Sequence, residues 1–120
     1  MENIITLINK TAREFVFLDM SIYSYSNNEL VIGMSDDLTY YHKFEIKFKN
    51  VFAIICNASW SVNTQKEIIK LADSSLADEI NLKHRVEIGN SVFQLMNEDE
   101  VVFYVVAAGL EFREKVVKYY

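Results

Sequence analysis

The spacing of apolar residues along the chain changes more than once, and each change marks a different predicted element. Within residues 3–12, isoleucine, leucine and alanine recur every three to four positions, while Glu2, Asn3, Asn9 and Lys10 fall on the opposite side. This spacing matches one apolar face of a helix with about 3.6 residues per turn. The pattern predicts a short amphipathic helix that packs on the rest of the domain.

From Phe15 the spacing falls to two residues, and β-branched and aromatic residues become frequent, which is typical of strands. One strand is predicted over residues 15–25 and the next over Glu29–Met34. Asn27 and Asn28 lie between them, and asparagine tolerates the left-handed backbone angles of a tight hairpin turn. Another turn is predicted at residues 35–37.

The clearest alternation spans residues 42–49, where phenylalanine and isoleucine take one face and charged residues the other. This segment is expected to be a strand with one buried and one solvated face. The solvated face is expected to carry Lys43, Glu45, Lys47 and Lys49. After Asn50, the unbroken apolar run of residues 51–56 predicts a second strand that is covered on both faces and lies nearer the middle of the sheet.

A capping box marks the start of a predicted central helix. Thr64 and Glu67 have the spacing at which a threonine side chain and a glutamate three residues later satisfy each other's free backbone N–H groups. The apolar positions that follow predict a helix over about residues 64–80. Ser74-Ser75 either interrupts this helix or caps a second turn, and the pattern leaves both alternatives open.

Strand patterns return after the helix and predict a three-stranded meander. The three strands are expected over residues 82–88, 92–96 and 101–108, with turns at 89–90 and 97–100. The alternation of residues 110–113 predicts a short last strand. Residues 114–120 fit either an extension of that strand or a helical turn.

This order of elements defines the expected fold class. Runs of strands separated by one central helix favour an α+β fold, in which helices cover one face of an antiparallel sheet. We expect residues 1–120 to form a single α+β domain with an N-terminal helix, one central helix and about six to eight mainly antiparallel strands. A chain of 120 residues buries roughly two-thirds of its unfolded surface, so it needs no disulfide or metal to fold.

Composition and charge narrow the range of functions. The chain has no proline and only three glycines, which disfavours linkers and glycine-rich phosphate-binding loops. Seventeen Asp and Glu against twelve Lys and Arg give a net charge of −5, and the cations are scattered, so nucleic-acid binding is not expected. The N-terminus lacks the basic segment of a signal peptide, and the longest apolar run, Val101–Leu110, is too short to span a bilayer. We expect a cytoplasmic protein that does not bind membranes.

No constellation of residues in the sequence predicts catalysis or metal binding. Cys56 stands alone in an apolar run and is expected to behave as a small buried hydrophobic residue. His42 and His84 lack the spacing of metal ligands, and each is expected on the solvent face of a strand. No metal site, cofactor or enzymatic activity is predicted. A hydrolase would require a cleft that holds Asp19, His42 or His84 with a perturbed pKa.

Two other features suggest binding to another protein. Acidic residues gather in two predicted turns, at 36–37 and 98–100, and if both turns lie at one end of the sheet, their carboxylates would attract a basic partner. The alternative is that hairpin tips are simply polar. The second feature is the eight Phe, seven Tyr and one Trp, which serve either interfaces or cross-strand packing. The candidate partner-binding residues are Glu98, Asp99, Glu100, Asp36, Asp37, Tyr40 and Tyr41.

The order of three motifs resembles that of small bacterial domains found among the immunity proteins of polymorphic toxin systems. The motifs are Phe17-Leu18-Asp19-Met20-Ser21-Ile22, Asn28-Glu29-Leu30-Val31-Ile32 and Phe44-Glu45-Ile46-Lys47-Phe48-Lys49-Asn50-Val51. In that pattern an Asp and a following Ile open the first strand, Leu-x-Ile marks the second, and an alternating Phe segment ends the third in Asn-Val or Gly-Val. The resemblance spans about residues 15–56 and consists of structural residues. It implies a cytoplasmic, antitoxin-like binding protein without enzymatic activity.

These observations favour a non-enzymatic module that binds another protein, with a basic toxin that it neutralises as one candidate partner. The alternative is a homo-oligomeric module that binds a small ligand, with its aromatic residues lining a pocket or a dimer interface. A homodimer is compatible with either hypothesis.

Overall fold

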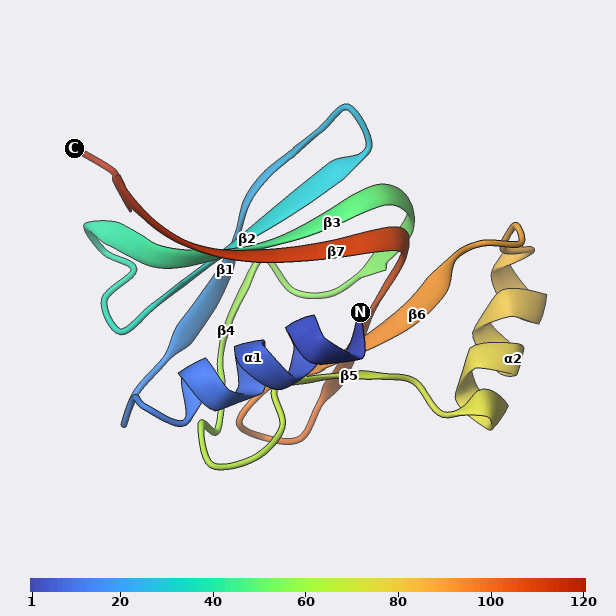
Figure 1. Ribbon diagram of the computed structural model, residues 1–120, viewed down its shortest axis with the longest axis horizontal. Helices are drawn as coiled ribbons and strands as arrows, with labels where there is room; N and C mark the ends of the chain where they lie inside the picture. Colours follow the sequence, from blue (N-terminus) through green and yellow to red (C-terminus); the bar gives the residue numbers. More distant parts are fainter.

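Seven strands form one antiparallel sheet, and two helices pack against it (Figure 1). The computed structural model describes residues 1–120. Along the sheet the strands follow the order β4-β1-β2-β3-β7-β6-β5. In chain order the elements are α1 (Glu2–Ala12), β1 (Asp19–Ser26), β2 (Glu29–Ser35), β3 (Tyr41–Ile55), β4 (Ser59–Ser61), β5 (Ile69–Leu71), α2 (Ser74–His84), β6 (Ser91–Met96) and β7 (Val102–Lys118). The predicted α+β class, antiparallel sheet and N-terminal helix are confirmed.

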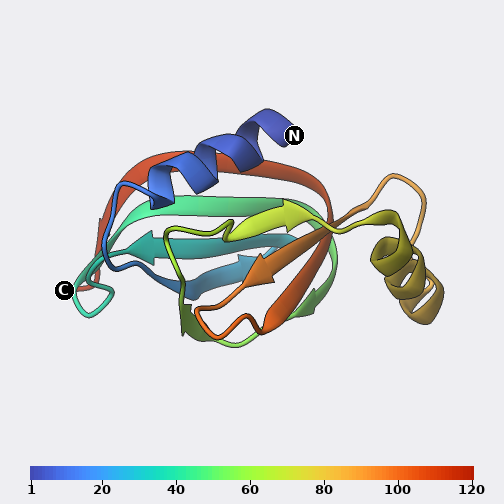
Figure 2. The same cartoon turned by 90° about the horizontal axis from the view of Figure 1, so that it is seen from below.

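Two long strands, β3 and β7, curl the sheet. Their pairing begins with Tyr41 and Lys118 and ends with Ile55 and Tyr104. The register shifts at two points between these pairs. Such bulges bend a strand and increase its local twist. β2 pairs with the first half of β3 and β6 with the first half of β7, so the long pair joins two smaller groups of strands. Figure 2 shows the curled sheet with α1 lying across it.

The main core lies between α1 and the inner face of the sheet. Three apolar residues of α1 join side chains from most of the strands in a cluster of 20 buried residues. A smaller cluster forms where Ile80 of α2 meets Val92 and Val106. These two valines alternate along their strands with the main-core residues Phe93 and Val105, so α2 covers the opposite face of the sheet. The prediction that the helices cover one face is therefore wrong, because side chains on both faces of β6 and β7 are apolar and each face needs cover.

α1 is also held by a polar contact that the apolar pattern does not predict. Asn9 falls on the solvated side of the helical pattern, yet only 5% of its surface is exposed. Its Nδ2 donates to the carbonyl oxygen of Ile69 at 2.9 Å, and its Oδ1 accepts from the backbone N–H groups of Ile68 and Ile69 at 2.8 and 3.3 Å. β5 is the last strand of the sheet, so these bonds satisfy backbone groups at its edge.

Residues 41–55 form one strand rather than the two predicted. Asn50 has a φ of 52°, a left-handed angle that asparagine tolerates, and the strand continues past it with a shift in register. The segment after Asn50 is not covered on both faces, since Phe52 and Ile55 are 39% and 41% exposed. The predicted position nearer the middle of the sheet is also wrong, because β2 stops pairing at Phe48 and the end of β3 has a neighbouring strand on one side only.

The central helix begins later than the capping box predicts. α2 starts at Ser74, and the Asp73 carboxylate caps it by accepting a hydrogen bond from the backbone N–H of Leu76 at 2.9 Å. Residues 69–71 form β5 instead, beside β6. The pattern assigns these apolar residues to the first turns of the helix, but in the structure they lie in the sheet. Their burial there outweighs the local helix signal.

The central helix also ends later than predicted. α2 continues to His84 and stops at Arg85, which has a left-handed φ of 53°. The predicted strand over residues 82–88 is therefore wrong, and the meander is a two-stranded hairpin of β6 and β7. His84 lies in the last turn of the helix rather than on a strand. β7 continues to Lys118, which decides in favour of a strand for most of residues 114–120.

The first hairpin follows the prediction except at its start. Asn27 and Asn28 have φ values of 51° and 61°, the pair of left-handed angles of a type I′ turn. β1 begins at Asp19 rather than at Phe15, whose ring packs edge-on against Phe44 with centroids 5.8 Å apart. Neither helix is long and apolar enough to cross a lipid bilayer.

Candidate functional site

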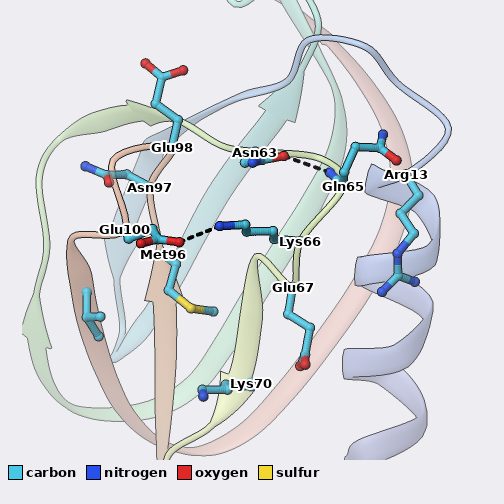
Figure 3. Close-up of a pocket in the computed structure, with 11 residues that line it drawn as sticks. Arg13, Asn63, Gln65, Lys66, Glu67, Lys70, Met96, Asn97, Glu98 and Glu100 are labelled. Atoms are coloured by element: carbon cyan, nitrogen blue, oxygen red, sulfur yellow. Dashed lines mark hydrogen bonds and ion pairs between the residues drawn. The ribbon is translucent and has the colours of Figure 1, made fainter.

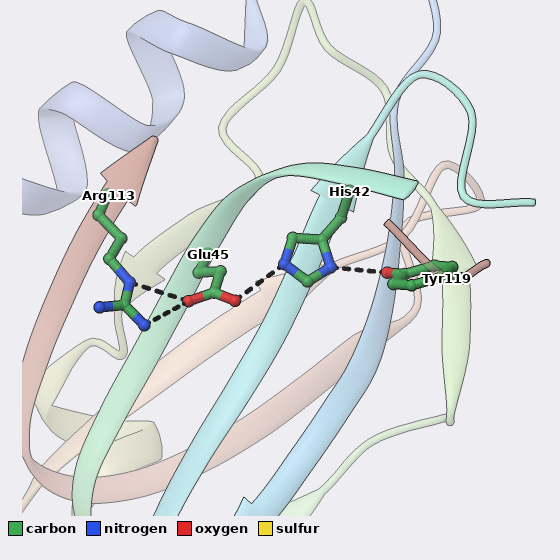
Figure 4. A network of polar contacts seen from close by, with 4 residues as sticks. All are labelled: His42, Glu45, Arg113 and Tyr119. Carbon is green, nitrogen blue, oxygen red and sulfur yellow. Dashed lines mark hydrogen bonds and ion pairs between the residues drawn. The ribbon is translucent and has the colours of Figure 1, made fainter. Parts of the chain in front are cut away.

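A buried polar network joins β3 to the C-terminal end of the chain (Figure 4). His42 is fully buried, which corrects its predicted place on a solvent face. Its Nε2 lies 2.8 Å from Oε2 of Glu45, and its Nδ1 lies 2.6 Å from the hydroxyl oxygen of Tyr119. Gly33 provides the room for the imidazole, because a Cβ at that position would lie 2.8 Å from Nδ1 of His42.

Glu45 is the charged centre of this network. The alternating pattern predicts it on the solvated face, but it is only 2% exposed because side chains from β7 and the C-terminus cover it. Arg113 donates to Oε1 through Nε at 2.8 Å and through Nη2 at 2.6 Å. Burial opposes ionisation of Glu45, but the hydrogen bonds from Arg113 and His42 outweigh it and hold the pKa of the carboxyl below its usual range.

The protonation of the network follows from the charge on Glu45. An ionised carboxylate only accepts, so Nε2 of His42 carries the proton and donates to it. When that is the only proton on the ring, Nδ1 accepts from the Tyr119 hydroxyl. Tyr23 completes the cover, with its ring stacked on Tyr119 at 6.0 Å and edge-on to His42 at 4.8 Å.

The order of groups is that of a carboxylate, a histidine and a hydroxyl, as in a proton relay. However, burial, together with the nearby Tyr23 and Glu45, raises the pKa of Tyr119, so its hydroxyl stays protonated near neutral pH. None of the four main surface hollows is lined by His42 or Tyr119. The geometry therefore supports a structural role, in which the network ties the end of the chain to the sheet.

The most enclosed hollow on the surface lies where α1, β5 and the β6–β7 turn meet (Figure 3). Its volume is about 480 Å³. It is lined by Arg13, Asn63, Gln65, Lys66, Glu67, Lys70, Met96, Asn97, Glu98, Glu100 and Val102. Nearly all of these are polar or charged, and Lys66 and Glu100 form an ion pair across the hollow.

A second hollow, of about 490 Å³, adjoins the first and shares Asn63, Gln65 and Glu98 with it. Here the loop between α1 and β1 presents Val16 and Phe17, which are 83% and 77% exposed. Glu98 and Asp99 line the same hollow, and neither makes an ion pair. We call the surface formed by Val16, Phe17, Glu98 and Asp99 the Phe17 surface.

The β6–β7 turn holds the acidic side of this surface in place. Oδ1 of Asn97 accepts hydrogen bonds at 2.9 Å from the backbone N–H groups of Asp99 and Val101. The backbone N–H of Glu98 donates to the carbonyl oxygen of Ser61 in β4 at 2.8 Å. Asn97 therefore stabilises the turn from within, and the bond to Ser61 holds the turn against β4, a strand at the edge of the sheet.

The five predicted carboxylates do not act as one group. The 36–40 turn adjoins the C-terminal end of β7, since Tyr41 pairs with Lys118, whereas the 97–101 turn immediately precedes β7. Asp36 pairs with Lys43 at 3.0 Å, and that lysine lowers the pKa of Asp36. Lys66 likewise lowers the pKa of Glu100. Asp37 accepts a hydrogen bond from the backbone N–H of Thr39, which makes it a turn residue.

The two predicted tyrosines differ in their surroundings. Tyr40 is 58% exposed and lies edge-on to Tyr120 with centroids 6.5 Å apart. Tyr41 is half-buried on β3, with the Lys43 ammonium 5.8 Å from its ring centroid. Neither lines the Phe17 surface. Sequence reasoning missed Val16 and Phe17 because a period of two assigned them to a strand, although β1 begins after them.

The remaining candidate residues do not come together in one site. Asp19 accepts a hydrogen bond from the Ser61 hydroxyl at 2.6 Å and makes no contact with a histidine. Cys56 is half-buried against the core, and burial raises the pKa of its thiol. No three His, Cys, Asp or Glu side chains come together in the arrangement of metal ligands. No family model, curated protein or solved structure matches the chain.

Proposed function

We propose that this protein is a non-enzymatic module that binds another protein through the Phe17 surface. The observation that carries the proposal is an exposed phenylalanine and valine in one hollow with two unpaired carboxylates. Contiguous exposed apolar side chains rimmed by polar residues mark interaction sites, and aromatic anchors contribute most of the energy of many interfaces. Phe17 would be the anchor of the interface and Val16 part of its apolar centre.

The charges indicate the chemistry of the partner. Glu98 and Asp99 have no cation of their own, and the chain carries a net charge of −5. A partner with lysine or arginine near its own apolar pocket would pair with them, and the pairing would speed association at low salt. A toxin whose active surface is basic is one partner of this kind, which agrees with the resemblance to immunity proteins.

The binding position is tested by photo-cross-linking. A photoreactive phenylalanine analogue replaces Phe17 in one variant, and Ile88, which is fully exposed in the α2–β6 loop, in a control variant. We expect position 17 to capture one basic protein from extracts of the source organism and position 88 not to capture it. Equal capture at both positions, or none at position 17, would contradict the proposal.

The role of the carboxylates is tested on the purified pair. The double variant Glu98→Gln/Asp99→Asn should slow association by about tenfold at low salt and reduce the salt dependence of the rate. The control Asp78→Asn/Glu79→Gln makes the same change of charge on an exposed part of α2 and should leave the rate nearly unchanged. If the two double variants behave alike, the acidic turn does not face the partner.

The alternative of a small-ligand module has less support. The hollow of about 480 Å³ falls within the usual size of ligand sites, roughly 300–1,000 Å³. Such sites are mostly apolar, whereas Met96 and Val102 are the only apolar residues among the eleven that line this hollow. A thermal-shift screen of metabolites separates the two hypotheses, since a ligand that binds the native state raises the melting temperature.

A further inference from the structure

The two terminal strands of the sheet have part of their edges satisfied within the chain. At β5, the side chain of Asn9 bonds the backbone of Ile68 and Ile69. At β4, the carbonyl oxygen of Ser61 accepts from the backbone N–H of Glu98. Both strands are also only three residues long. An edge strand that is short and whose backbone N–H and C=O groups are already hydrogen-bonded rarely pairs with a further strand.

The long β3–β7 pair leaves two further edges without a neighbouring strand. β6 stops pairing with β7 at Ala107, so residues 109–118 have an open edge. That segment carries charged residues along its length, which disfavour pairing with another strand. They are Glu111, Arg113, Glu114, Lys115 and Lys118.

The other open edge belongs to the end of β3 and carries no charged residue. β2 stops pairing at Phe48, and the backbone N–H of Val51 makes the last bond to this side, with Asn28. Residues 53–55 therefore pair with β7 alone, and Phe52 lies in the bulge between Val51 and Ala53. No charged residue and no proline occurs between Lys49 and Lys66. Phe52 and Ile55 are 39% and 41% exposed, and a hollow of about 390 Å³ lies beside Phe52.

We propose that this edge pairs with the same edge of a second copy of the chain, so that two sheets join into one across a two-fold axis. The open edge offers backbone donors and acceptors, and the occupant that matches them is an extended strand. A second copy supplies such a strand, and because residues 50–65 are uncharged, self-pairing brings no like charges together. Antiparallel pairing of identical strands is self-complementary, as a two-fold interface requires.

The geometry also sets the strength of this contact. Four paired residues extend over about 13 Å, well below the extent of an interface that buries the usual ~1,200–2,000 Å². The dimer is therefore expected to exchange with the monomer, with a dissociation constant in roughly the micromolar to millimolar range. The dimer edge and the loop that carries Phe17 lie toward opposite ends of the molecule in Figure 1, so this inference does not depend on the proposed function.

Sedimentation equilibrium over a wide concentration range provides the test. The average mass of the wild-type protein should rise from the 14.0 kDa of one chain toward twice that value. The variant Phe52→Lys/Ile55→Lys should remain at the mass of one chain, because two charges on the edge oppose pairing. The control Leu82→Lys/Val116→Lys adds the same charge at residues that are 84% and 60% exposed, and it should associate like the wild type.

Circular dichroism and thermal melting show that each variant is folded before its mass is compared. A wild-type protein that stays monomeric up to about 1 mM overturns the proposal. It is equally overturned if the edge variant associates like the wild type, or if the control variant loses association to the same extent. A folded but monomeric edge variant beside an associating control supports it.

A distance measurement tests the arrangement directly. A nitroxide label is placed on Asn57→Cys in a Cys56→Ser background, so that each chain carries one label just beyond the paired segment. Antiparallel pairing centred between Ala53 and Ile54 places the two labelled residues about 20–30 Å apart. A dipolar distance distribution in that range supports the edge-to-edge dimer. Distances confined to more than about 40 Å would overturn it.

Discussion

Replacement of Arg113 by methionine tests whether the buried charge of Glu45 depends on that arginine. The substitution keeps most of the side chain's apolar length and removes both hydrogen bonds to Oε1 of Glu45. Glu45 is 2% exposed in the wild type, so the variant leaves a buried carboxylate with His42 as its only side-chain partner. The variant therefore isolates the effect of an uncompensated buried carboxylate.

The magnitude follows from the burial of the two partners. Removing one member of a fully buried ion pair costs about 3–5 kcal/mol. The side chain of Arg113 is 47% exposed, so water already weakens this pair and replaces part of what the arginine supplies. We expect the free energy of unfolding at pH 7 to fall by about 1–3 kcal/mol, measured by urea denaturation with circular dichroism.

The sign of the pH dependence gives a sharper test. In the wild type the pKa of Glu45 is lower in the folded state, so its contribution is present above the unfolded value and is lost as the pH falls below about 4.5. Without Arg113, burial should raise the pKa of the Glu45 carboxyl above its unfolded value. The variant should therefore gain stability from Glu45 as the pH falls from 7 to 5, whereas Glu45 gives the wild type no such gain.

The exposed pair of Lys49 and Glu111 supplies a matched control on the same two strands. Lys49→Met also removes one cation beside a carboxylate, but water solvates the glutamate that remains, so the loss of stability should be much smaller. The reasoning is refuted if Arg113→Met costs no more than Lys49→Met, or if its stability follows the wild-type dependence on pH.

Three further substitutions test individual features of the fold. Asn9→Ala leaves two buried backbone N–H groups of the β5 edge unpaired, and the free energy of unfolding should fall by about 2–4 kcal/mol in urea denaturation. Gly33→Ala places a methyl group 2.8 Å from the His42 ring and should cost about 1–3 kcal/mol, more than Gly109→Ala, where the nearest atom lies at 3.3 Å. Asp73→Ala removes the N-cap of α2 and should cost about 1 kcal/mol with a loss of helical circular dichroism signal. An unchanged helical signal in Asp73→Ala would show that the cap contributes little to the stability of α2.

The local parts of the fold could be predicted because they depend on neighbouring residues. Asn27 and Asn28 form the predicted turn, since left-handed backbone angles are a property of the residues themselves. The apolar spacing of residues 3–12 likewise suffices for a helix that packs on one face. The helix signal at Thr64 failed because β6 offers residues 69–71 a place in the sheet, which a local pattern cannot reveal.

The candidate sites needed contacts between distant residues. The acidic turn at Glu98 and Asp99 could be identified from the sequence, but its apolar neighbour Phe17 lies in a connecting segment that the period-two pattern assigned to a strand. The fold, in turn, places the Asp36 turn at the other end of β7. Whether these residues meet on one surface depends on the order of the strands in the sheet. The periodicity of a single strand carries no information about that order.

The sequence by itself determined the α+β class, the first hairpin and the uncharged run that ends β3, because composition and periodicity are properties of short segments. Only the tertiary structure decided which of these segments are covered. Glu45 takes a solvated position in the alternating pattern, yet it is buried. Arg113, 68 residues further along the chain, bonds its carboxylate, and Tyr119 bonds His42 across 77 residues. The end of β3 alternates less and is apolar, yet its edge is open because β2 is too short to reach it. Burial follows from the neighbours that the whole chain brings together.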